Sequence, residues 1–311
     1  MKKKLPTLSI GIPAYNEEGN IAYLLDSLLR QKAISYKLIE IIVMCDGCTD
    51  NTASIVKTYK DKYPFIKIFD RKKRTGKAPA LNYMYKIHRG DFLFQPDADL
   101  VMGGDNSLED LMKVMISNDH IDLVSPRHLP VKEKSLWAML AYCSYNIFSD
   151  AAMKLHNGRN AYTVMGASLI RGAFTKTFTY PKGIIGDQTY LFASVIHHNP
   201  HGYKFARKAH VYFRTVGTFK EWRELGVRST GADKMTVLDR FDHSLVDKYY
   251  TMSREIYFTS LIKYFATNPL LTMATLGMEV YIRLFPLKNS SVKNGTWEPN
   301  ASSKIGIKIT I

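Results

Sequence analysis

Short apolar runs alternate with amphipathic stretches along the first third of the chain. Residues 8–13 form an apolar run that predicts a strand, and residues 17–31 then carry apolar side chains at helical spacing. The plan repeats as a strand at 39–44 with a helix at 52–63, and as a strand at 66–69 with a helix around 80–85. Such alternation predicts a doubly wound, mostly parallel α/β sheet.

Two carboxylates follow the next apolar run. Residues 92–94 predict a buried strand, and Asp97 and Asp99 leave its carboxyl end, where open α/β sheets bind their ligands. Alternate residues of an extended segment point the same way, so both acids can converge on one divalent cation. Asp-x-Asp pairs also occur on solvated turns, so this pair gains meaning only from the rest of the chain.

The second half of the sequence is less regular. A strand is expected at residues 121–125 and a long, mostly apolar helix at 136–155. Residues 254–288 are apolar and aromatic, but polar residues interrupt them before they reach the roughly 18 to 20 residues of a spanning helix. One or two helices that lie in a membrane interface or pack on the domain are therefore expected.

The expected organisation has three parts. One large α/β domain is expected over residues 1–235, a helical segment over 236–288, and a polar, disordered tail over 289–311. Within the first part, two halves are expected, at 6–105 and at 106–235.

The net charge of the chain limits the kinds of binding partner that are expected. With 43 Lys and Arg against 28 Asp and Glu, the formal charge of +15 predicts attraction to phosphates, whether on a nucleotide, a nucleic acid or an anionic membrane. No recognisable nucleic-acid-binding motif accompanies the charge, so no nucleic-acid partner is expected. The basic start runs into a strand without the apolar stretch of a signal peptide, which predicts a cytoplasmic protein. If the apolar residues 254–288 contact a membrane, the protein would be peripheral on its cytoplasmic face. Cys45 and Cys48 form a C-x-x-C, for which redox use and half of a zinc site stay open.

Several short motifs occur in one order between residues 6 and 230. They are IPAYNEE at 12–18, DGCTDNT at 46–52, GKAPALN at 76–82, DAD at 97–99, GAS at 166–168 with Arg171, and GDQ at 186–188. The series resembles the family-2 glycosyltransferases, inverting enzymes of the GT-A fold that use nucleotide-diphospho-sugars. The resemblance implies a GT-A glycosyltransferase domain over residues 1–235 with a Rossmann-like, doubly wound sheet, followed here by the C-terminal helical segment. Residues 6–105 would then be the nucleotide-binding half of that domain and 106–235 the acceptor half.

The resemblance also implies roles for single residues. The nucleotide would be bound by Pro13, Ala14, Tyr15, Glu17, Asp46, Lys77 and Asp97. Asp46 would accept the N3–H of uracil, unless it only caps a turn. Lys77 would meet the diphosphate at a helix start, with Arg71 or Arg74 as partners, unless it is a solvated charge. Asp97 and Asp99 would hold Mg²⁺ or Mn²⁺ on the two phosphates.

Inverting transfer further needs a base for the acceptor hydroxyl. By resemblance this is Asp187, with a helix-capping role as the alternative and His197, His198 and His201 as competing bases. The family's processive signature is absent around residues 221–229, which favours single transfer. Trp222, Arg223 and Arg228 are expected either at the acceptor or diphosphate or packed against the domain.

The resulting prediction is a divalent-metal-dependent, inverting, single-transfer glycosyltransferase. Its donor would be a nucleotide-diphospho-sugar, UDP-linked by family habit, and its acceptor a hydroxyl of a glycan or a lipid-linked molecule. Substitutions at Cys45, Cys48 and Gly186 leave open a catalytically degenerate sugar-nucleotide-binding protein. A sugar nucleotidyltransferase is a weaker alternative, because its glycine-rich loop after the first strand is replaced by Pro13-Ala14-Tyr15-Asn16.

Overall fold

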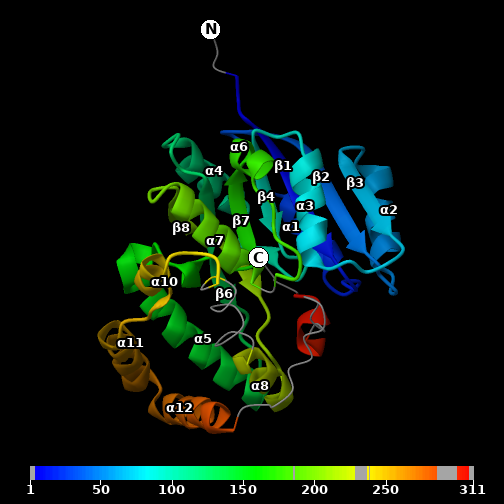
Figure 1. Cartoon of the computed structure of the whole chain (residues 1–311). Helices are drawn as coiled ribbons and strands as arrows, with labels where there is room; N and C mark the ends of the chain where they lie inside the picture. Colours follow the sequence, from blue (N-terminus) through cyan, green and yellow to red (C-terminus); the bar gives the residue numbers. More distant parts are fainter. Residues whose placement is uncertain (1–3, 185, 228–236, 238, 286–299, 308–311) are drawn as a thin grey trace.

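A single eight-stranded sheet runs through the molecule (Figure 1), which is described from a computed structural model covering residues 4–184, 186–227, 237, 239–285 and 300–307. The strand order is β3-β2-β1-β4-β7-β6-β8-β5. The strands are β1 (Thr7–Ala14), β2 (Lys37–Asp46), β3 (Ile66–Arg71), β4 (Phe92–Pro96), β5 (Val101–Met102), β6 (Leu123–Pro130), β7 (Ala167–Arg171) and β8 (Tyr203–Phe213).

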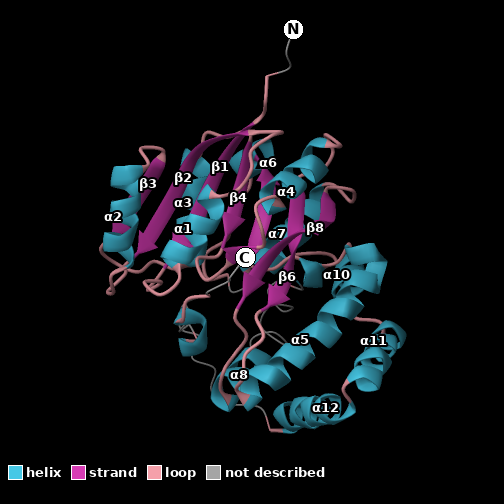
Figure 2. Ribbon diagram, turned by 180° about the vertical axis from the view of Figure 1, so that it is seen from behind, coloured by secondary structure: helices cyan, strands magenta, loops and turns pink. Residues whose placement is uncertain are grey.

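Helices cover both faces of this sheet and build a separate layer below it (Figures 1 and 2). They are α1 (Ile21–Leu29), α2 (Thr52–Lys62), α3 (Lys77–Ile87), α4 (Ser107–Ile116), α5 (Leu136–Lys154), α6 (Gly172–Thr177), α7 (Asp187–His198), α8 (Phe219–Val227), α10 (His243–Tyr250), α11 (Arg254–Thr267) and α12 (Pro269–Leu284). Short 3-10 turns lie at Leu155–Gly158, Ala161–Thr163 and Ala301–Lys304.

Strand β2 shows why the sheet is covered on both sides. Its residues are apolar without alternation, and successive side chains enter opposite cores: Ile41 and Val43 pack in one, Ile42 and Met44 in the other. All four are at most 1% exposed. Parallel strands buried on both faces are typically such continuous apolar runs.

The sheet is mixed rather than uniformly parallel. β1 pairs in parallel with β2 and β4, and β2 with β3, as the repeated strand-helix units predict. β7 is antiparallel to both β4 and β6. The α/β, GT-A-like prediction is confirmed, but β7 and β8 were not assigned from the sequence.

The helical layer lies below the carboxyl ends of the central strands (Figure 2). α5 is its centre, and α11 and α12 both pack against it. A small core of Leu140, Ala141, Val216, Trp222 and Ile282 joins α5, α8 and α12. Among the described helices, none combines the length and apolar character needed to cross a bilayer.

The chain's last part differs from the expectation of a disordered tail over 289–311. Residues 300–307 are ordered, with a 3-10 turn and Ile307 only 2% exposed, because they pack against the loop after β1 and the start of α8. Residues 286–299 and 308–311 lie outside the described part of the chain.

Candidate active site

The predicted site residues meet at one edge of the sheet. β1, β2 and β4 run parallel, so Tyr15, Asp46 and Asp97 all follow or end a strand at the same edge. α3 begins there at Lys77, and α7 begins at Asp187. This edge, at the lower ends of the strands in Figure 1, is where open α/β sheets bind ligands.

Lys77 joins two acids that are far apart in the sequence. Its Nζ lies 2.7 Å from Asp97 Oδ1 and 2.9 Å from Asp187 Oδ2. The Asp187 side chain is 15% exposed and that of Asp97 28%, so the ion pairs are only partly screened by water. Lys77 is thus paired in this structure, although its side chain is 35% exposed. The two attractions outweigh partial desolvation and raise the pKa of Lys77, so it stays an ammonium.

Asp97 is fixed by backbone as well as by charge. Its N–H donates to the Gly166 carbonyl at 2.6 Å, and a Cβ on Gly166 would lie 2.8 Å from Asp97 Oδ2. Only glycine lets the chain before β7 approach this closely. Burial raises the pKa of Asp97 to about 6; Lys77 opposes the rise, and the carboxylates of Asp187 and Asp99 add to it.

Asp97 and Asp99 do not lie on an extended segment, contrary to the alternation argument. Residues 98 and 99 form a turn, with Leu100 N donating to the Asp97 carbonyl at 3.4 Å. The carboxylate of Asp99 also acts on Glu17, whose pKa is raised to about 7, first by burial and then by Asp99. Asp99 thus interacts electrostatically with both Glu17 and Asp97, and Lys77 joins Asp97 to Asp187. We call this series the charge chain.

The acids fit a divalent ion that also binds phosphate. Mg²⁺ is commonly held by one or two carboxylates together with substrate phosphates, and Asp97 and Asp99 are a donor set of that kind. The Lys77 ammonium shows that this edge already accommodates positive charge. Within the described ranges, no three His, Cys, Asp or Glu side chains form a complete metal site.

Asp46 has a different set of partners from the one expected. Its Oδ2 accepts from Thr75 N at 2.8 Å and Gly76 N at 2.7 Å, and its Oδ1 accepts from Thr75 Oγ1 at 2.7 Å and Arg71 at 3.5 Å. A carboxylate offers about four acceptor sites, so these contacts saturate it. In this structure Asp46 therefore caps a turn. Its carboxylate fixes the loop of residues 72–76 between β3 and α3, which we call the basic loop.

That loop closes against the loop after β1. Arg74 stacks over the Tyr15 ring at 3.8 Å from its centroid, and Gly47, at φ 74°, leaves room for the Arg74 backbone. Asn16, at φ 51°, accepts from Thr49 N at 2.8 Å. The loops that carry the first two motifs are thus held in one arrangement.

The residues predicted around α8 are used in packing. Trp222 is 6% exposed within the core shared by α5 and α12, and Arg223 donates to the Phe285 carbonyl at 2.7 Å. Both side chains therefore contact the domain itself in this structure. Arg228 lies outside the described residues. His197, His198 and His201 lie at the far end of α7 from Asp187, and all three cysteines are free.

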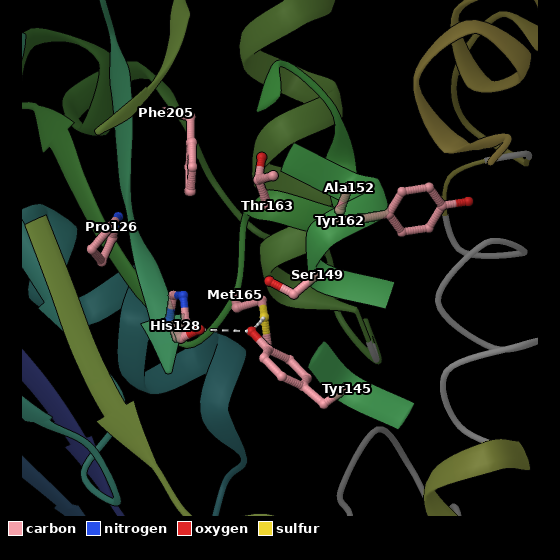
Figure 3. Close-up of a pocket in the computed structure, with 9 residues that line it drawn as sticks. All are labelled: Pro126, His128, Tyr145, Ser149, Ala152, Tyr162, Thr163, Met165 and Phe205. Carbon is pink, nitrogen blue, oxygen red and sulfur yellow. Dashed lines mark hydrogen bonds between the residues drawn. The ribbon is translucent and has the colours of Figure 1, made fainter. Parts of the chain in front are cut away.

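A small cavity lies between β6 and α5 (Figure 3). It is bounded by β6, α5 and the segment before β7, and Tyr145 Oη donates across it to the His128 carbonyl at 3.1 Å. Its volume of about 10 Å³ suits a single water molecule and is too small for a sugar.

Comparison with known proteins settles the family. The model for glycosyl transferase family 2 matches residues 9–178, more than half of the chain. The chain belongs to glycosyl transferase family 2. All of the motifs up to Arg171 fall within the matched region, whereas Asp187 follows it.

Individual relatives agree with this assignment. A dolichyl-phosphate beta-glucosyltransferase of Trichomonas vaginalis is 35% identical over 133 residues, which is 40% of each chain. The chain spans less than half the length of the first curated relatives it matches. A Pyrobaculum calidifontis mannosyltransferase in complex with GDP-Man and Mn²⁺ superposes with a TM-score of 0.60 at 16% identity, over 91% of this chain and 82% of the other. TarS 1-349 of S. aureus, in complex with UDP-GlcNAc, superposes with a TM-score of 0.52 at 17% identity, over 93% of this chain and 95% of the other. At these identities the two structures show the shared fold.

Two long-range contacts beside the candidate site were not predicted from the sequence. Lys304 forms an ion pair with Glu17 and donates to the Tyr15 carbonyl at 2.9 Å, and Glu221 binds residue Ser302. Both contacts join parts of the chain more than 80 residues apart. No motif or periodicity in the polar C-terminal residues indicated them.

Proposed function

We propose that this protein is an inverting glycosyltransferase that moves one sugar from a nucleotide-diphospho-sugar to a hydroxyl group, with Mg²⁺ or Mn²⁺ as cofactor. The observation that carries the proposal is the Lys77 ammonium held between Asp97 and Asp187 at the ends of the parallel strands. A diphosphate placed here meets a cation, a helix start and two carboxylates suited to a metal. The family resemblance favours UDP as the nucleotide.

The residues divide the chemistry among them. Asp187 takes the proton from the acceptor hydroxyl as its oxygen attacks the anomeric carbon from the face opposite the diphosphate, which inverts the configuration. Lys77 holds Asp187 in place in the free protein and offers its charge to the leaving diphosphate. A cation bound by Asp97 and Asp99 would act as a Lewis acid on that leaving group. The tightly bonded Asp46 keeps the basic loop beside the nucleotide.

The acceptor is proposed from an unusual helix pair. α11 and α12 turn small polar residues inward: Ser260, Thr272 and Thr275 are fully buried. Their outward side chains are large and apolar and include Phe258, Ile262, Phe265, Leu270, Met273, Val280 and Leu284. We call these side chains the apolar face. Amphipathic helices of soluble domains show the reverse distribution, so the apolar face, exposed among the described residues, is suited to contact an apolar partner.

An anionic membrane surface is the partner that fits best. The chain's formal charge of +15 attracts acidic lipids, and the apolar face can enter the boundary between headgroups and acyl chains. Peripheral binding would bring the active-site edge close to a lipid-linked acceptor or a glycan on that membrane. The short connection at Asn268, whose side chain accepts from Leu271 N, keeps α11 and α12 as one unit.

A thermal-shift screen tests the donor proposal directly. Nucleoside diphosphates and their sugars, with Mn²⁺ or with EDTA, would be added to the wild type and to the Asp97→Ala, Asp99→Ala double variant. Specific binding at a hundred times the dissociation constant stabilises the fold by about 2.7 kcal/mol, so Mn²⁺ with the right diphosphate should raise the melting temperature of the wild type alone. Equal shifts in EDTA or in the double variant would refute the metal site. Binding without any turnover would favour the degenerate-binder alternative.

A further inference from the structure

The C-terminal residues 300–307 are docked on the active-site edge. Figure 1 shows this segment, in red, between the lower ends of the strands and α8. Asn20 donates to the Ser303 carbonyl at 2.6 Å, Arg214 donates to the Gly306 carbonyl at 3.1 Å, and Ile307 is 2% exposed. We call residues 300–307 the C-terminal strap.

Three glycines from separate parts of the chain make this docking possible. A Cβ on Gly19 would lie 2.2 Å from the Lys304 carbonyl oxygen, and one on Gly306 would lie 2.2 Å from the Gly19 carbonyl oxygen. A Cβ on Gly217 would lie 2.6 Å from Ser302 Oγ. Real Cβ atoms do not approach backbone atoms this closely, so a side chain at Gly19 or Gly306 would displace the strap, whereas one at Gly217 would force the Ser302 side chain to move.

The strap also ties two functional elements together. Glu221, 7% exposed, accepts from Ser302 N at 2.8 Å and from Ser302 Oγ at 2.5 Å. The same carboxylate accepts from Thr218 N at 3.1 Å, which caps the start of α8. At the other side, the Ser303 carbonyl accepts from Asn20 and Lys304 donates to the Tyr15 carbonyl. Both partners lie in the loop of residues 15–20 after β1, which we call the nucleotide loop. One short segment therefore fixes α8 relative to this loop.

Lys304 brings a positive charge to the end of the charge chain. Its Nζ pairs with Glu17 and contacts the Tyr15 carbonyl. Glu17 is 8% exposed, so its ion pair with Lys304 is only partly screened by water. The negative series from Glu17 to Asp187 is thus bounded by Lys304 at one end and contains Lys77 near the other.

We propose that the C-terminal strap completes the donor site and that Lys304 is a further donor-binding residue, contacting the nucleoside diphosphate of the sugar donor. This inference rests on the proposed function. Lys304 and Lys77 then supply positive charge to the diphosphate from two sides, and the docked strap covers the nucleotide loop. By reciprocity, a bound donor must stabilise the docked strap as much as the docked strap strengthens donor binding.

Titration calorimetry with UDP and Mn²⁺ tests the inference in the full-length chain. Lys304→Ala removes the charge, Lys304→Arg keeps it, and Gly306→Ala undocks the strap without altering any charge. Loss of a charge-assisted hydrogen bond weakens binding by about tenfold or more. We expect a loss of this size in UDP affinity for both Lys304→Ala and Gly306→Ala. Lys304→Arg should stay within about threefold, because the charge is retained.

Hydrogen exchange supplies the second measurement. UDP with Mn²⁺ should slow exchange of the Ser302 and Ser303 amides in the wild type and not in Gly306→Ala. If the wild type binds UDP while all three variants bind it equally well and exchange is unaffected, the strap proposal is overturned and the proposed function stands. If the wild type binds no nucleoside diphosphate with Mn²⁺, the proposed function fails and the strap's role fails with it. Melting curves confirm that each variant is folded.

Discussion

The sheet and the α11–α12 pair distribute their apolar side chains in opposite ways. In β4, Phe94 is fully buried between two covered faces, whereas Phe265 in α11 is 46% exposed. The small polar Ser260 and Thr275 take the inward positions of the helix pair instead. The difference shows that hydrophobic content alone does not say what a segment packs on. In the sheet the apolar side chains stabilise the fold, while in the helix pair they form an exposed surface, for which we propose a membrane partner.

The same substitution in both regions should give very different losses of stability. Phe94→Ala removes a fully buried ring and should lower the free energy of unfolding by about 3–5 kcal/mol. Phe265→Ala should change it by no more than about 0.5 kcal/mol. Urea unfolding followed by circular dichroism gives both values. A loss of several kcal/mol for Phe265→Ala would mean that the apolar face is part of the protein's own core.

Membrane binding should respond in the reverse sense. Leu270 is 80% exposed on the apolar face, and transferring such a side chain into an apolar medium is worth about 1.5–3 kcal/mol. Leu270→Glu should therefore weaken flotation with vesicles that contain acidic lipid by about tenfold or more.

A matched control lies far from the helix pair. Ile34 is 67% exposed in the connection between α1 and β2, and Ile34→Glu should leave flotation unchanged. If the two variants float alike, the apolar face does not meet the membrane. The donor-induced thermal shift should be the same in both, because neither residue lies at the active-site edge.

The smallest expected effect concerns the contact that joins the helix pair to α5. Asp150 of α5 pairs with Lys154 at 2.7 Å and with Lys263 of α11 at 2.8 Å, and accepts from Ser260 at 2.8 Å. Burial alone would raise its pKa, but these three bonds outweigh burial and lower the pKa from 3.8 to about 2. Asp150→Asn should cost on the order of 1 kcal/mol at neutral pH.

The pH dependence of that cost has a definite sign. Because the folded-state pKa lies below the unfolded value, the Asp150 contribution is fully present above about pH 5 and is lost as the pH falls through 3.8 toward 2. The stability difference between the wild type and Asp150→Asn should shrink over that range. A difference that stays constant down to pH 3 would show that the carboxylate is not stabilised by these contacts.

The sequence was most informative where structure is local. The units from β1 to β4 were predicted because each strand and helix shows its own periodicity, and the motifs at Tyr15, Lys77 and Asp97 follow directly from them. β7 and β8 were missed because each pairs with a strand about 70 residues away in the sequence, β7 with β4 and β8 with β6. Tertiary pairing of this kind leaves little local signal.

Side-chain roles were harder to predict than positions. Asp46 was placed at the correct strand end, but the sequence did not show that the basic loop would saturate its carboxylate. Trp222 shows the same limit, since a basic aromatic helix can face a ligand or a core. Lys304 could not be found at all, because its ion pair with Glu17 joins the two ends of the chain.

The central claim is that Asp187, held by Lys77, is the base for the acceptor hydroxyl. One rate measurement tests this claim most directly. Release of the nucleoside diphosphate from the donor found by thermal shift would be followed with lipid vesicles or glycans as acceptor, for the wild type, for Asp187→Asn and for the exposed control Asp119→Asn. Loss of a general base should lower kcat of Asp187→Asn by about 10²–10⁴-fold with donor affinity unchanged, while Asp119→Asn matches the wild type. Full activity of Asp187→Asn with the same acceptor would contradict the assignment of the base.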